Sequence, residues 1–88
     1  MNTIEKKIDP EYFDAIESGK KKFELRLGDF DISEGDILVL REFDREKQAY
    51  SGRSVEKKVT YVRKFDVNKL WWPIEDINRH GLQIINLG

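Results

Sequence analysis

Residues 10–27 read PEYFDAIESGKKKFELRL and contain the two patterns that decide the fold. The first pattern is a helix start, because Asp9 can cap free N–H groups and Pro10 suits the first helical position. Apolar residues then recur on one helical stripe, formed by Tyr12, Phe13 and Ile16. Gly19 can take the left-handed conformation that ends a helix. We therefore predict a helix over about residues 10–18.

The second pattern is a strict alternation over residues 22–27. The apolar set is Phe23, Leu25 and Leu27, and the polar set is Lys22, Glu24 and Arg26. A period of two is typical of a half-buried strand. In such a strand Glu24 lies between two cations, and Lys21 can join them only from the turn after Gly19.

Further segments of the chain are also typical of strands. Residues 2–8 give a weak pattern, whereas residues 37–43 (ILVLREF) are apolar on both faces for four residues and then amphipathic, as in a central strand. After a polar hairpin loop over 44–48, extended structure resumes at 49–50, with a bulge or turn at Ser51-Gly52 and a strand over 54–63. Residues 65–81 indicate a loop with a short helix near 74–79, and the last strand is expected over 82–87. About five strands and one main helix predict an α+β domain with a mostly antiparallel, curled sheet.

Length and composition restrict the classes of protein further. The 88 residues suffice for one domain, so we expect a single domain over residues 1–88. The absence of cysteine excludes disulfides, thiolate metal sites and cysteine nucleophiles, and it favours a cytoplasmic location. No apolar run approaches the roughly 20 residues of a membrane span, and the first residues lack a signal peptide's apolar centre. We therefore expect no membrane partner.

Charge is dense but balanced, with 16 basic and 17 acidic residues and a net charge of −1. Such a chain has no global field to attract a polyanion, so a nucleic-acid site would have to be a local patch. His80 is the only histidine, and the acidic loop lacks the spacing of a calcium-binding loop. We therefore expect neither a metal ion nor another cofactor. The oligomeric state is left open.

The segment 19–26 is the strongest candidate for a site. Arg26 offers a planar fork for a phosphate or a base edge, Lys21 offers a point charge, and Glu24 can hold both cations in place. The competing interpretation is a solvated strand face with alternating charges. Arg41, at the end of the central strand, could line the same cleft or pair with a carboxylate at its rim. Arg53 could extend a basic patch, although an arginine at a hairpin end is usually solvated, which is the interpretation we prefer.

The same segment resembles a known family. Gly19, Lys21, Glu24 and Arg26 match the GxKxxExR signature of the ASCH domain (activating signal cointegrator homology), which has a PUA-like β-barrel fold. The resemblance extends over about residues 4–63, through Gly35-Asp36, an apolar strand at 37–40 and Tyr50-Ser51-Gly52-Arg53. It is strongest to a compact bacterial and phage subgroup of unassigned function.

The resemblance implies binding of RNA or a nucleotide in a cleft lined by Lys21, Glu24 and Arg26. Some ASCH-like proteins are amidohydrolases that act on acetylated cytidine, which gives a second hypothesis with Lys21 and Glu24 as acid–base residues. Glu24 stands where those enzymes have a threonine, which is a departure from their pattern. The third hypothesis is a protein-interaction module, favoured by the neutral charge and the Trp71-Trp72 pair. We also expect at least one of these tryptophans to fill the core.

Overall fold

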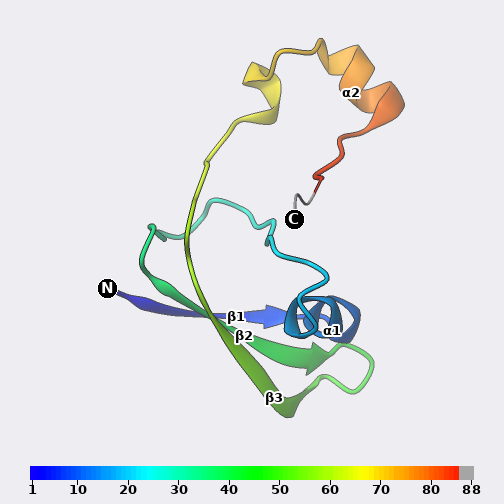
Figure 1. Ribbon diagram of the computed structural model, residues 1–88. Coiled ribbons are helices and arrows are strands. Elements are labelled where there is room, and N and C mark those ends of the chain that lie inside the picture. Colours follow the sequence, from blue (N-terminus) through cyan, green and yellow to red (C-terminus); the bar gives the residue numbers. More distant parts are fainter. Residues whose placement is uncertain (86–88) are drawn as a thin grey trace.

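The computed structural model describes residues 1–85 and contains one small sheet with the first helix packed against it (Figure 1). The elements in chain order are β1 (Thr3–Ile8), α1 (Pro10–Glu17), β2 (Ile37–Asp44), β3 (Ala49–Lys58), the short 3-10 helix η1 (Val67–Lys69) and α2 (Ile74–His80). The sheet order is β1-β2-β3, with β1 parallel to β2 and β2 antiparallel to β3. The predicted α+β class is therefore confirmed.

The core lies between α1 and one face of the sheet. It consists of Ile8, Phe13, Ile16, Leu38 and Leu40, and of these Phe13 and Leu40 are fully buried. In β2 the alternate residues Leu38 and Leu40 belong to the core, as the period of two requires, and Ile4 of β1 and Val55 of β3 pack against it. The helix predicted over 10–18 is confirmed at Pro10–Glu17, and two members of its apolar stripe are buried while Tyr12 is exposed.

The two ends of α1 differ in how far they follow the sequence prediction. Gly19 ends the helix with a φ of 81°, and its N–H donates to the carbonyl of Ile16 over 3.1 Å. Asp9 occupies the N-cap position but makes no capping hydrogen bond. Its carboxylate instead accepts from Nε of Arg45 at 2.8 Å, so the predicted capping role of Asp9 is wrong.

The β2–β3 hairpin is shaped by its turn and by a bulge. Oδ1 of Asp44 accepts from the backbone N–H groups of Glu46 and Lys47, which fixes the turn over 45–48. A register shift opposite Arg41 and Phe43 places a bulge in β3, where Gly52 has a φ of 96°. The predicted hairpin loop and the predicted bulge at Ser51-Gly52 are both confirmed.

Gln48 is the only non-glycine residue of the described part of the chain with a positive φ, at 52°. A side chain in this left-handed region costs roughly 1 kcal/mol, and glycine avoids that cost. We therefore expect Gln48→Gly to raise the free energy of unfolding by up to about 1 kcal/mol in a urea titration. Lys47→Gly, at a neighbouring position without a positive φ, is the control and should lower stability. Equal losses in both variants would contradict this expectation.

The strand predicted over 22–27 is not formed. Leu25 and Leu27, expected to face a core, are 62% and 80% exposed. The segment lies alongside the sheet without joining its ladder, because its contact with β1 runs through the Arg26 side chain and not through paired backbone groups. The alternation in the sequence therefore shows which side chains share one side of the segment. It does not show that the segment forms a strand.

The predicted closed barrel of about five strands is not found in residues 1–85. These residues form an open sheet of three strands. The strand predicted over 54–63 ends at Lys58. Residues 82–85 are not in a strand, and the rest of the strand predicted over 82–87 lies outside the described residues. The short helix near 74–79 is confirmed as α2, with Gly81 after it.

The C-terminal third contributes little to the core. In Figure 1 the chain leaves β3 and runs away from the sheet to η1 and α2. Trp71 and Trp72 are 86% and 51% exposed and pack edge to face against each other at 5.6 Å. The expectation that one of them fills the core is wrong, because α1 already covers the core face of the sheet. No helix within residues 1–85 is long and apolar enough to cross a membrane.

Candidate functional site

The residues Lys21, Glu24 and Arg26, called here the motif cluster, converge although they do not lie in a strand. Nζ of Lys21 lies 3.1 Å from Oε1 of Glu24, and Nε of Arg26 lies 2.6 Å from its Oε2. The three side chains are 18%, 15% and 29% exposed in the order of the sequence. One carboxylate thus holds two cations in a group that solvent can still reach.

Local structure explains how Lys21 reaches this position. The left-handed Gly19 turns the chain back, and the N–H of Lys21 donates to the carbonyl of Ala15 over 2.8 Å. The ammonium then lies 5.0 Å from the ring centre of Tyr12 and 4.9 Å from that of Phe23. Lys21 is therefore in the turn after the helix, as the sequence analysis required, and it is flanked by two aromatic rings.

Arg26 connects the motif cluster to the sheet. One of its terminal nitrogens donates to the backbone carbonyl of Lys7 in β1. Because β1 is an edge strand, a side-chain donor satisfies a carbonyl that the ladder leaves free. The motif cluster consequently lies along the outer edge of β1.

Arg41 belongs to a different group. Its guanidinium lies 4.0 Å from the ring centre of Tyr50, and Tyr50 packs edge to face on Phe43 at 5.1 Å. The ammonium of Lys7 lies 4.2 Å from the ring centre of Phe43. We call Lys7, Arg41, Phe43 and Tyr50 the sheet-end cluster. Its signal in the sequence was the alternation of Arg41 and Phe43 at the end of the central strand, of which only Arg41 was singled out.

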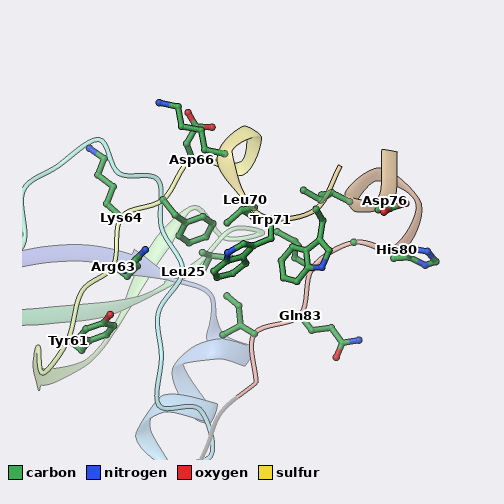
Figure 2. A pocket seen from close by; sticks show the side chains of 17 residues that line it. Leu25, Tyr61, Arg63, Lys64, Asp66, Leu70, Trp71, Asp76, His80 and Gln83 are labelled. Atoms are coloured by element: carbon green, nitrogen blue, oxygen red, sulfur yellow. The ribbon is translucent and has the colours of Figure 1, made fainter. Parts of the chain in front are cut away.

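Two hollows lie near these groups, and neither is lined by the motif cluster or by Arg41. The larger has a volume of about 1070 Å³ and is formed almost entirely by residues 61–84, with exposed aromatic side chains (Figure 2). Leu25 is its one lining residue from the N-terminal half, so the motif segment borders it. The smaller, of about 450 Å³, is lined by Lys7, Asp9, Phe43, Arg45 and Gln48.

The comparison with known proteins places the chain in a family without assigning it an activity. Residues 3–72 match the family model described as "Domain of unknown function (DUF3850)". The chain belongs to this family. It is also 38% identical over 58 residues to an uncharacterized 12.9 kDa protein in the GpA 3′ region of Escherichia phage P2. That match covers 66% of this chain and 51% of the relative, so the chain spans about half the relative's length. No solved structure matches.

The DUF3850 region contains the whole sheet, α1, the motif cluster and the sheet-end cluster, and it ends at Trp72 just before α2. Both candidate groups therefore lie in the part that defines the family. Within residues 1–85 no group of three or more histidine, aspartate or glutamate side chains could hold a metal ion. His80, at the end of α2, is exposed.

A third polar group in the DUF3850 region was missed by the sequence analysis. Arg53, expected to be solvated, donates from Nε and a terminal nitrogen to both oxygens of the buried Glu42, at 3.0 and 2.6 Å. It also donates to Asp14 of α1 at 2.9 Å. The hydrogen bond from Arg53 lowers the pKa of Glu42 below its ordinary value and raises the pKa of Arg53 itself. This group joins β2, β3 and α1, so its role is structural.

Asp36, also buried, fixes the entry to β2. Its carboxylate accepts from the backbone N–H of Asn2 at 3.0 Å and from that of Ser33 at 2.9 Å. These bonds lower the pKa of Asp36, with the bond from Asn2 the larger cause. Since Asn2 precedes β1, Asp36 anchors the edge strand on which Arg26 and Lys7 depend.

Proposed function

We propose that this DUF3850 domain is an ASCH-like module that binds RNA or a nucleotide through the motif cluster. The observation that carries the proposal is the convergence of Lys21 and Arg26 on Glu24 in a segment that lacks strand structure. A regular strand would turn Lys21 to the face opposite Glu24 and Arg26, whereas here the turn after Gly19 brings Lys21 to them. The grouping is therefore not a by-product of strand alternation, which supports a recognition role.

The charges of the motif cluster suit an anion. Two cations and one carboxylate give a local charge of +1 in a chain whose net charge is −1. Glu24 fixes both cations before a ligand arrives, which lowers the conformational cost of binding. Arg26 can present its planar fork to a phosphate or a base edge, and Lys21 can add a point charge.

The surroundings of Lys21 supply an apolar contact for a base. Tyr12 is exposed on α1 and lies beside the Lys21 ammonium, with Phe23 on the other side. Aromatic side chains next to a cationic group are the combination that binds single-stranded nucleic acid with little sequence preference. A base stacked on Tyr12 would bring its phosphate to Lys21 and Arg26.

The ASCH-like assignment extends the family result. It rests on Gly19, Lys21, Glu24 and Arg26, which match the family's GxKxxExR signature. In this proposal, residues 22–27 occupy the place along the β1 edge where a further barrel strand would pair, with Arg26 as the existing link. Pairing of this segment with β1 would add a fourth strand to the sheet, a step towards the PUA-like barrel.

The test measures the affinity of a fluorescein-labelled single-stranded RNA by anisotropy at low salt. We expect Lys21→Gln/Arg26→Gln to weaken binding at least about tenfold, since each removes a charged hydrogen bond to phosphate. Glu24→Gln should strengthen binding, because the gain in local positive charge should outweigh the loss of the carboxylate that holds both cations in place. If the ion pairs only stabilised the fold, Glu24→Gln would weaken RNA binding, as the double variant does.

The matched control is Lys57→Gln/Lys58→Gln, which changes the net charge by the same amount on exposed residues at the far end of β3. Its affinity should stay close to that of the unchanged chain. If both double variants lose the same affinity, the motif cluster has no special role and only net charge matters. Failure of the unchanged chain to bind RNA or nucleotides would refute the proposal.

Hydrolysis of an acylated nucleoside is not part of the proposal. Nζ of Lys21 donates to the Glu24 carboxylate at 3.1 Å, whereas a lysine that acts as a base or nucleophile needs its lone pair directed at the substrate. The hypothesis is tested by incubating the chain with a panel of acylated nucleosides. Turnover that disappears in Lys21→Gln would establish it.

A further inference from the structure

We infer that the sheet-end cluster is a second nucleotide site, which stacks one base of a single-stranded nucleic acid on Phe43 and holds its phosphate between Lys7 and Arg45. The inference rests on the proposed function for the class of ligand. Its residues, however, are separate from those of the motif cluster.

The site is a real concavity formed by three parts of the chain. Lys7 comes from β1, Phe43 from β2 and Arg45 from the hairpin turn, and all three line the hollow of about 450 Å³. Volumes of roughly 300–1,000 Å³ are typical of small-ligand sites. A flat ring on one wall and cations on the others match a base with its phosphate.

The aromatic wall is held rigidly, while the cation over it can move. Tyr50 packs edge to face on Phe43 with 74° between the ring planes, and the Arg41 guanidinium covers the Tyr50 ring. The Lys7 ammonium lies over the Phe43 ring on a long, exposed side chain. A base can therefore take the place of the ammonium on the ring, and the displaced ammonium is then free to meet the phosphate.

Positive charge on this face of the sheet is concentrated at the end where Lys7 lies. Lys7 and Arg45 line the hollow together with one carboxylate, that of Asp9, which binds Arg45 at 2.8 Å, and Arg41 lies beside the hollow on Tyr50. Two residues earlier along β1, the register aligns Glu5, Val39 and Glu56 across the three strands, so the neighbouring row is acidic. A polyanion is therefore attracted to the sheet end and not to the middle of the sheet.

The aromatic ring and the positive charge together indicate the class of ligand. An acidic peptide would satisfy the cations but leave the Phe43 ring without a flat partner, and an apolar ligand would make no use of the cations. The motif cluster adjoins the site, because Arg26 donates to the carbonyl of Lys7. A short single-stranded nucleic acid can therefore reach both groups.

The experiment uses the full chain and records ¹H–¹⁵N NMR spectra during titration with adenosine 5′-monophosphate, with inorganic phosphate and with a six-nucleotide RNA. We expect the nucleotide to shift the signals of Lys7, Phe43, Arg45 and Tyr50, and phosphate alone to shift only Lys7 and Arg45. Fluorescence of Trp71 and Trp72, which lie in the larger hollow, should not change. Phe43→Leu should weaken RNA binding roughly 5- to 150-fold, whereas Tyr61→Leu, at an exposed tyrosine elsewhere, should not.

The outcomes separate this inference from the proposed function. Shifts confined to residues 20–26 would overturn the second site and leave the proposed function standing. Shifts confined to the sheet end would support the second site and overturn the role of the motif cluster. Tryptophan quenching without shifts at the sheet end would overturn the inference in favour of the larger hollow, and no shift anywhere would overturn both.

Discussion

Phe13→Ala is expected to lower the free energy of unfolding by about 3–5 kcal/mol, the usual cost of truncating a buried phenylalanine. Phe13 is 0% exposed and lies at the centre of the contact between α1 and the sheet. Its ring also supports the Arg53 guanidinium, whose central carbon lies 4.6 Å from the ring centre. A domain of this size has few other large buried side chains to compensate.

Urea denaturation followed by circular dichroism measures this change. Tyr12→Ala is the matched control, since it truncates an aromatic residue of the same helix that is exposed. We expect its unfolding midpoint to change little. Equal losses in the two variants would mean that α1 does not pack on the sheet as described.

Arg53→Ala is expected to be the most destabilising of the single changes that break an ion pair. Glu42 is buried, with its side chain 6% exposed, and the change removes the donor to both of its oxygens. An unpaired buried carboxylate costs far more than a lost surface pair. Arg45→Ala, which breaks the exposed pair with Asp9, is the control and should have a small effect.

The loss caused by Arg53→Ala should also depend on pH. Because Arg53 depresses the pKa of Glu42 in the folded state, the pair stabilises the fold above the ordinary glutamate value of 4.5, and this stabilisation disappears as the pH falls through the lowered folded value. The stability difference between the two chains should therefore be full at pH 7 and shrink below pH 4.5. The titration of Asp36 contributes equally to the stability of the unchanged protein and of the variant, so it cancels in their difference. A difference independent of pH would show that Arg53 acts through packing alone.

Helices, strands and turns could be predicted from the sequence where one short pattern of residues determines one element. Pro10, the apolar stripe and Gly19 defined α1, the ILVLREF segment defined the central strand, and Ser51-Gly52 marked the bulge. The alternation over 22–27 was misleading, because a period of two describes an extended segment whether or not it finds a hydrogen-bonded partner. The barrel prediction depended on this strand and on a last strand over 82–87, of which residues 82–85 are not in a strand.

The candidate site residues could likewise be predicted only where they lie close together in the sequence. The sequence indicated that Lys21, Glu24 and Arg26 would come together, since they are close in the chain. Arg53 was misjudged because its partners Glu42 and Asp14 lie on other elements. The sheet-end cluster was missed for the same reason, as it requires Lys7 from β1 to meet Phe43 from β2.

The most direct test of the RNA-binding proposal is the salt dependence of affinity for one single-stranded RNA. For single strands each phosphate contact contributes about 0.7 to the negative slope of log K against log salt concentration. We expect the slope of Lys21→Gln/Arg26→Gln to be shallower than that of the unchanged chain by about 1.4, for two lost contacts. Identical slopes in the two chains would show that neither cation meets a phosphate and would contradict the proposal.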